Sequence, residues 1–121
     1  MTILSKCLLE EAKAISQAAK KLNPLEVEKA VEILEKCGKR KNKLLVTGVG
    51  KSGIVARKIA ATFSSIGLVS VYLNPLDALH GDLGIVDSED VSILISNSGE
   101  TKELLEIIPH LKLRKSLLIA L

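Results

Sequence analysis

The residues that could do chemistry gather first in the stretch LLVTGVGKSGIVARKIAA, Leu44 to Ala61. It passes from apolar residues into three glycines, a lysine and a serine, and then into a helical pattern. A glycine-rich loop before a helix exposes backbone N–H groups, and the N-terminus of a helix favours negative charge. The stretch therefore predicts a phosphate site, and the phosphate could belong to a nucleotide, a dinucleotide or a sugar.

Two nucleotide-type interpretations fit this loop poorly. A Walker loop needs a glycine five positions before Gly-Lys-Ser, and that position is Leu45, inside the predicted strand. The dinucleotide pattern GxGxxG does match Gly48 to Gly53. It also needs an acidic residue at the end of the next strand to bind the ribose, where this chain has Leu73 and Asn74. An NAD-binding oxidoreductase is therefore only an alternative hypothesis.

A second loop before a predicted helix is rich in hydroxyl groups. It reads Ser96-Asn97-Ser98-Gly99-Glu100-Thr101. Simple capping is one interpretation, because Asn97 followed by Glu100 resembles a capping box. Capping needs a single short polar residue, however, and this loop has four. We favour a site in which hydroxyls, backbone amides and the helix dipole together bind a phosphate monoester.

The surrounding pattern predicts the elements that must position both loops. Val-, Ile- and Leu-rich segments without polar alternation are typical of strands buried on both faces. They alternate with helices, which indicates right-handed crossovers and a parallel sheet. The expected strands are 44–47, 68–73, 91–95 and 116–121, the expected helices are 52–66 and 101–113, and a loop or short helix is expected over 74–82. Both loops then lie at the carboxyl edge of the sheet, where open α/β sheets bind ligands.

Two amphipathic helices are expected before the first strand. Apolar residues recur at helical spacing from Ile3 to Leu22. In the second helix Asn23 is the expected cap, Glu26 completes a capping box, and Gly38 is the expected exit. Cys7 and Cys37 fall on the apolar sides of these helices, and we expect both to be buried thiols.

Composition and charge exclude several classes of protein. With 121 residues, of which 47% are hydrophobic, the chain predicts a single folded domain. The net charge of +3 is too balanced to indicate nucleic acid binding, and we interpret the basic run from Lys39 to Lys43 as a solvated helix end rather than an anion site. No apolar run is long enough to span a membrane, and no signal peptide is visible. We expect a soluble cytoplasmic protein without nucleic acid or membrane partners.

Three motifs in order, GVGKSG, DALHGDLG and ISNSGETKELL, resemble the sugar isomerase (SIS) domain, and most closely its arabinose 5-phosphate isomerase branch. The resemblance covers nearly the whole chain from about residue 4. It implies a three-layer αβα sandwich with a flavodoxin-like parallel sheet, assembled as a homodimer or homotetramer. It also implies interconversion of D-ribulose 5-phosphate and D-arabinose 5-phosphate, with a small phosphorylated sugar as the ligand and no cofactor.

The resemblance also implies roles for individual residues. Ser96, Asn97, Ser98 and Thr101 would hold the phosphate, with Gly50, Ser52 and Gly67 also at the substrate edge. Lys51, His80 and Glu103 fall on positions that contact or act on the sugar.

Aldose–ketose isomerisation needs a base and a donor for the enediolate oxygen, and Glu103 and Lys51 suit these two roles. His80 could open the sugar ring, shuttle a proton or bind a hydroxyl. The simpler alternatives are a helix-start carboxylate, a solvated lysine, and a turn histidine bonded to Asp77 or Asp82.

The chain departs from the family pattern in two places. Asn74 stands where many members have a histidine linked to metal binding, so we expect no metal. The family domain continues beyond the apolar run SLLIAL at residues 116–121. We therefore expect the chain to be the N-terminal part of an SIS domain, without its remainder or any CBS domains. A non-catalytic sugar-phosphate sensor is the alternative function within the family.

Overall fold

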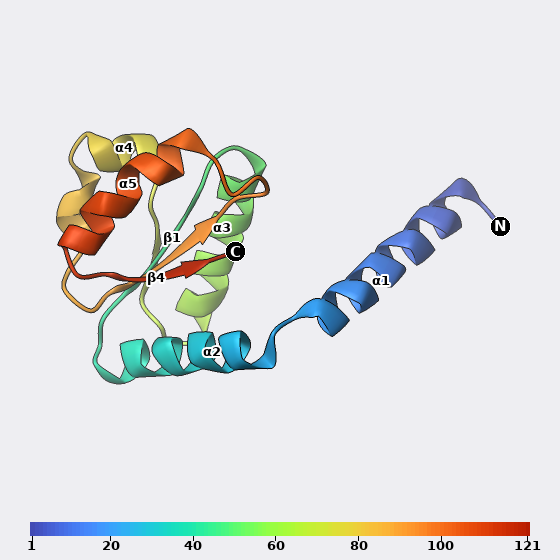
Figure 1. The fold of residues 1–121 in the computed structure, drawn as a ribbon, viewed down its shortest axis with the longest axis horizontal. Coiled ribbons are helices and arrows are strands. Elements are labelled where there is room, and N and C mark those ends of the chain that lie inside the picture. The colour runs from blue at the N-terminus through green and yellow to red at the C-terminus, as the bar shows by residue number, and fades with distance from the viewer. The chain divides into compact units, whose positions relative to one another are not determined.

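The computed structural model describes every residue, 1–121, as an alternation of helices and strands (Figure 1). The elements are α1 (Ile3–Lys21), α2 (Pro24–Lys39), β1 (Leu44–Gly48), α3 (Lys51–Ser65), β2 (Ser70–Tyr72), α4 (Pro75–Leu79), the 3₁₀ helix η1 (Asp82–Ile85), β3 (Val91–Ile95), α5 (Lys102–Leu113) and β4 (Leu117–Ala120). The chain forms two compact units, Met1–Val31 and Glu32–Leu121, and the second contains the whole sheet.

The sheet has four parallel strands in the order β2-β1-β3-β4. Its central pair is β1 and β3, which run in register from Leu44 opposite Val91 to Gly48 opposite Ile95. This order is the first part of the flavodoxin-like order 2-1-3-4-5. The predicted α/β class with a flavodoxin-like parallel sheet is confirmed.

Helices cover both faces of the sheet, because neighbouring side chains of a buried strand point to opposite sides. Leu45 and Leu94 pack against residues of α4, η1 and α5, including Ala78, Leu83 and Ile107. Leu44, Val46 and Ile93 pack instead against the end of α2 and against α3. Figure 1 shows α3 on one side of the strands and α4 and α5 on the other, which makes three layers.

The prediction that all strands are buried on both faces is correct only for the two central ones. All five residues of β1 are buried, and so are four of the five in β3. The strands β2 and β4 lie at the edges, and Val71 and Leu117 are exposed there. Strand β2 is also shorter than predicted, with three residues. An edge strand has a partner on one side only, and the apolar composition of a short strand does not reveal that position.

The ends of α2 match the prediction at one end only. Asn23 caps the start, since its Oδ1 accepts a hydrogen bond from the Leu25 N–H at 3.0 Å, but Glu26 makes no reciprocal bond. The helix runs through Gly38, and Lys41 takes the left-handed conformation, with φ of 56°. The N–H groups of Lys41 and Asn42 donate to the carbonyls of Gly38 and Cys37, which is the Schellman pattern. The predicted exit at Gly38 is therefore wrong.

The two cysteines differ in burial. Cys37 packs in the layer that contains α3, as predicted, and burial raises the pKa of its thiol. The prediction for Cys7 is wrong, because this residue is exposed. The unit Met1–Val31 has no buried residue, so its apolar stripe encloses no interior. None of the helices combines the length and apolar character that a membrane crossing would require.

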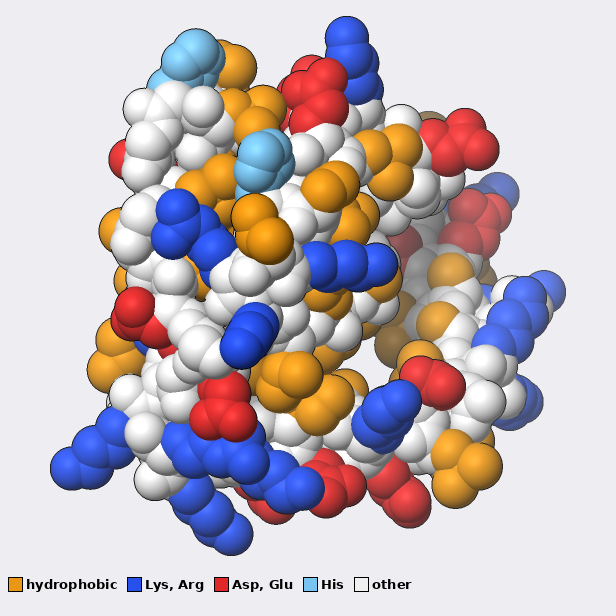
Figure 2. Space-filling model, turned by 60° about the vertical axis from the view of Figure 1, so that its left-hand side comes forward, with side chains coloured by type: hydrophobic (Ala, Val, Ile, Leu, Met, Phe, Trp, Pro, Cys, Tyr) orange, Lys and Arg blue, Asp and Glu red, His pale blue; other side chains and the backbone are white.

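Two of the four basic residues in the run from Lys39 to Lys43 form ion pairs. Lys43 Nζ lies 2.6 Å from Asp90 and 2.8 Å from Asp87, and Arg40 lies 3.7 Å from Glu89. In the space-filling view, acidic side chains lie among the lysines and arginines of the lower edge (Figure 2). Lys39 and Lys41 form no ion pair and are exposed, in agreement with the interpretation as a solvated helix end, whereas Lys43 is partly buried.

Asp90 anchors the amino edge of the sheet. Its carboxylate is buried and accepts hydrogen bonds from the Asn42 side chain and from the N–H groups of Lys43 and Asp87. Burial alone would raise the pKa of this carboxyl, but the Lys43 ammonium and the other donors outweigh burial and hold the pKa below its ordinary value. The network therefore ties the start of β1 to the turn before β3.

We predict that Asp90→Asn destabilises the protein by about 3 kcal/mol, because the partly buried Lys43 ammonium loses a charged partner. The native pKa of Asp90 is depressed, so its contribution to stability is complete above the unfolded value of about 3.9 and is lost as the pH falls through the native value. Urea unfolding between pH 7 and pH 3 should show a smaller loss of stability in the variant than in the wild type. Asp82→Asn, at an exposed carboxylate, is the control, and equal pH profiles for all three proteins would contradict the assignment.

Candidate functional site

The two predicted loops meet at the carboxyl edge of the sheet. The glycine loop follows β1 and the serine loop follows β3, and these strands are direct neighbours. From β1 the chain turns into α3 on one face, and from β3 it turns into α5 on the other. This divergence is a topological switch point, the place where open α/β sheets form a ligand crevice.

The glycines of the first loop serve mainly to bring α3 close to β1. A Cβ on Gly53 would lie 2.8 Å from the Gly48 carbonyl oxygen and 2.9 Å from the Tyr72 hydroxyl. A Cβ on Gly48 would lie 2.7 Å from the backbone of Ser52. Gly50 has φ of 62° and open space around it, so it supplies the sharp turn into the helix.

Side-chain capping distinguishes α3 and α5 from the other α-helices of the chain. Thr2, Asn23 and Asn74 accept hydrogen bonds from first-turn amides of α1, α2 and α4. Neither α3 nor α5 has such a side-chain cap. The Gly53 N–H of α3 donates to the Gly50 carbonyl, but no side chain caps the other first-turn amides of α3 or those of α5, and unsatisfied first-turn amides favour an anion.

The serine loop is held in shape by its own hydroxyls. Ser96 Oγ lies 2.7 Å from Thr101 Oγ1 and accepts a hydrogen bond from the Gly99 N–H at 3.0 Å. Ser98 Oγ accepts one from the Glu100 N–H, also at 3.0 Å. Asn97 makes no side-chain hydrogen bond, and Thr101 is the residue before the helix. The capping-box alternative for Asn97 and Glu100 is therefore wrong, because these bonds organise the loop and leave the first turn of α5 open.

Two cavities open at this edge. One of about 280 Å³ is bounded by the glycine loop, the end of β2, the start of α4 and Glu103. Another of about 370 Å³ is bounded by the serine loop, the apolar side of α5 and the end of β4. The residues of the first are Gly48, Val49, Gly50, Tyr72, Asn74, Pro75, Leu76 and Glu103. Together they offer a polar pocket with one carboxylate beside a hydroxyl-lined pocket.

The structure brings most of the predicted site residues to this edge. Ser96, Asn97, Ser98 and Thr101 line the second cavity, while Gly50 and Glu103 line the first. Lys51 and Ser52 form the first turn of α3 and border the same loop without lining either cavity. Both Lys51 and Glu103 have exposed side chains without an ion-pair partner.

Besides Lys51 and Ser52, two further predicted residues lie outside the two cavities. His80 follows the end of α4 and is exposed; its imidazole bonds to neither Asp77 nor Asp82, although its backbone N–H donates to the Asp77 carbonyl. Gly67 follows α3, just before the amino end of β2. Its expected place at the substrate edge is a mistake, because the 15 residues of α3 carry the chain about 22 Å to the opposite edge.

Sequence reasoning did not assign Tyr72 and Asn74 to the site, although both line the first cavity. Tyr72 donates from its hydroxyl to the Gly48 carbonyl at 3.0 Å, and the Arg57 guanidinium lies 4.4 Å from its ring centre. Asn74 Oδ1 accepts from the Leu76 and Asp77 N–H groups and so starts α4. Their position directly after β2, at the carboxyl edge, was the available signal.

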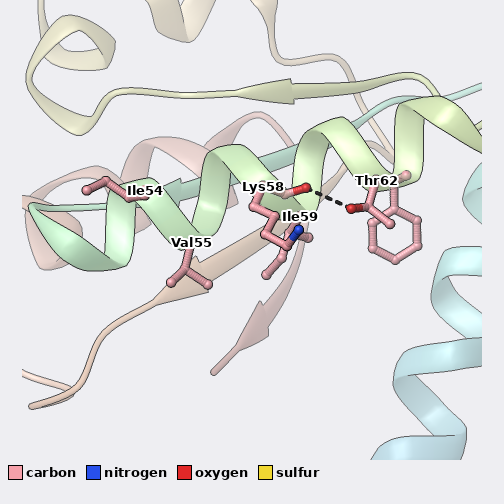
Figure 3. A pocket seen from close by; sticks show the side chains of 6 residues that line it. Ile54, Val55, Lys58, Ile59 and Thr62 are labelled. Atoms are coloured by element: carbon pink, nitrogen blue, oxygen red, sulfur yellow. Dashed lines mark hydrogen bonds between the residues drawn. The ribbon is translucent and has the colours of Figure 1, made fainter.

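A third cavity, of about 400 Å³, lies along the outer face of α3. Its lining is mostly apolar and comes from Ile54, Val55, Lys58, Ile59, Thr62 and Phe63 (Figure 3). The Thr62 hydroxyl donates to the Lys58 carbonyl within the helix, as the dashed line marks. Lys58 is the only charged residue of this lining, which contains no carboxylate or histidine that could act as the base in isomerisation.

Comparison with known proteins decides the family. The model of the SIS domain matches residues 39–121, which include the entire sheet and both loops. The chain belongs to the SIS domain family. The SIS domain here contains every residue of the two edge cavities.

The relatives of this SIS domain include named enzymes. Arabinose 5-phosphate isomerase KpsF of Escherichia coli O6:H1 is 38% identical over 112 residues, which are 93% of this chain and 33% of that protein. A structure from E. coli CFT073 in complex with arabinose 5-phosphate is 40% identical, with a TM-score of 0.81 over 99% of this chain and 65% of that one. A crystal structure from Listeria monocytogenes is 39% identical, with a TM-score of 0.89 over 97% of this chain and 60% of that one. The chain spans about a third of the length of KpsF.

The close approach of α3 to β1 gives a prediction for the SIS domain. Gly53→Ala should destabilise it by about 1–3 kcal/mol, since the added methyl meets backbone that cannot move freely. Gly84→Ala is the matched control, because a Cβ at Gly84 would meet nothing within 4 Å. Urea unfolding of both variants measures the difference in stability. Equal unfolding midpoints would show that the contact of α3 with β1 does not exclude a side chain at position 53.

Proposed function

We propose that the chain is part of an aldose–ketose isomerase for phosphorylated sugars, and that its substrate pair is D-arabinose 5-phosphate and D-ribulose 5-phosphate. The observation that carries the proposal is the pair of uncapped helices, α3 and α5, that begin at the switch point between β1 and β3. The name of KpsF and the arabinose 5-phosphate ligand of the related E. coli structure support the choice of sugar.

The phosphate belongs at the serine loop. The first-turn amides of α5 carry no side-chain cap, and the helix dipole adds favourable potential for an anion there. Ser96, Ser98 and Thr101 supply hydroxyls that already converge within the loop. A phosphate monoester can accept hydrogen bonds from these hydroxyls in place of those that they make to one another.

The sugar belongs near Glu103, in the pocket shared with the glycine loop. Isomerisation removes a proton from the carbon beside the carbonyl and returns it to the neighbouring carbon through an enediolate. Glu103 is the proposed base, because its carboxylate lines the cavity and forms no ion pair. Lys51 is the proposed donor to the enediolate oxygen, from the first turn of the helix across the switch point.

His80 is the third residue to which we assign a role in turnover. We assign it a contact with a sugar hydroxyl or a proton transfer, following the family pattern. His80 is exposed at the end of α4 and, like Lys51, lies outside the lining of both cavities.

The two alternatives make different demands on the site. A non-catalytic sensor would bind the same phosphosugar and leave it unchanged, so only a turnover assay separates it from an isomerase. An NAD-binding oxidoreductase would need an acidic group after β2, and that position holds Asn74, whose side chain caps α4. Self-association as a homodimer or homotetramer stays a prediction, and sedimentation equilibrium measures it.

Binding should depend on the phosphate. We expect D-arabinose 5-phosphate to bind in calorimetric titration and unphosphorylated arabinose not to bind. Ser98→Ala should weaken binding about tenfold, because a hydrogen bond to a charged group is worth about 1.5–3 kcal/mol. Ser88→Ala, at the opposite edge of the sheet, is the control. Equal affinity for the two sugars would refute the phosphate site.

Turnover should depend on the Glu103 carboxylate. Glu103→Gln should lower the isomerisation rate by about 10² to 10⁴ while the phosphosugar still binds. Glu106→Gln, one turn along α5 and outside the cavity, should keep the wild-type rate. Coupled detection of ribulose 5-phosphate measures this, ideally in the longest chain that carries these residues. Near wild-type turnover by Glu103→Gln would remove Glu103 as the base.

A further inference from the structure

Thr47 has a buried hydroxyl without a hydrogen-bond partner. None of its surface is exposed, and no protein group bonds to its Oγ1. The other buried polar side chains of the sheet region are satisfied: Asp90 has several donors, and the Ser92 and Ser116 hydroxyls lie 2.7 Å apart. Since buried polar groups in native proteins are nearly always bonded, Thr47 requires a physical explanation.

The position of Thr47 links it to the Glu103 cavity. Thr47 and Leu45 are two residues apart on β1, so their side chains point to the same face of the sheet. Leu45 packs on that face against residues of α4 and α5. The register partner of Thr47, Leu94, belongs to that layer as well. The next residue, Gly48, lines the cavity together with residues of α4 and α5. Thr47 does not itself line this cavity, but it directly precedes Gly48 in β1 and lies on the face of the sheet that α4 and α5 cover.

We propose that Thr47 is a further binding residue of this site and that its hydroxyl donates a hydrogen bond to a sugar hydroxyl when the cavity is occupied. The inference rests on the proposed function, because it requires a sugar beside Glu103. Threonine can change its χ1 rotamer, and no existing hydrogen bond opposes that rotation here. A donor without a partner destabilises the free protein, and binding supplies the missing acceptor.

The proposal predicts opposite effects on stability and binding. Thr47→Val keeps the side-chain shape and removes the hydroxyl, so the ligand-free protein should melt at the same temperature or higher. The same variant should bind D-arabinose 5-phosphate about fivefold more weakly, the effect of one lost hydrogen bond. Its affinity for inorganic phosphate should not change, because the serine loop lines a different cavity. Thermal unfolding and calorimetric titration measure both effects.

Thr47→Ser is the matched control. It keeps the hydroxyl and removes a buried methyl, so it should melt lower than the wild type and bind the phosphosugar with wild-type affinity. If the wild type binds but Thr47→Val binds equally well, or melts lower than Thr47→Ser, the inference about Thr47 is overturned and the proposed function stands. If the wild type does not bind the phosphosugar, both fall together.

Discussion

The parallel pairing of β1 with β3 is the constraint on which the candidate site depends. Each strand ends in a loop that is ordinary in isolation, one rich in glycine and the other in serine. Only their pairing places the two loops side by side. The crossovers then leave in opposite directions, so α3 and α5 start from adjacent positions on different faces of the sheet. The crevice between them follows from this connectivity and needs no special residue of its own.

The two edges of the sheet differ in how far their polar groups are hydrogen-bonded. At the amino edge, Asp90 gathers Lys43, Asn42 and two backbone amides into a closed network. At the carboxyl edge, the first turns of α3 and α5 lack side-chain caps, and Thr47 lacks any partner. Folding stability favours satisfied groups, and a binding site needs unsatisfied ones. The contrast separates the part of this domain that anchors the sheet from the part that is available to a ligand.

The glycine loop combines packing with binding. Gly48 and Gly53 let α3 approach β1 to a distance that no side chain would allow, and Tyr72 fastens the contact through the Gly48 carbonyl. Only Gly50 is free of such contacts. The glycine pattern from Gly48 to Gly53, which resembles a phosphate-binding motif, therefore serves in large part to position α3 against β1. Its contribution to an anion site comes from where the first turn of α3 is placed.

Much of this protein could be predicted from its residues. Alternating apolar strands and amphipathic helices specified a parallel α/β sheet, because local periodicity and handedness leave few topologies. The serine loop and Glu103 were also predictable, since a polar cluster between a buried strand and a helix must lie at the carboxyl edge.

The tertiary structure alone decided which strands are edges, that Gly67 lies at the opposite end of α3, and that Cys7 is exposed. It also decided that Tyr72 and Asn74 line the cavity and that Thr47 has no partner. These properties depend on contacts between residues distant in the chain. Sequence spacing records the local backbone conformation, whereas burial and hydrogen-bond satisfaction depend on which surfaces meet.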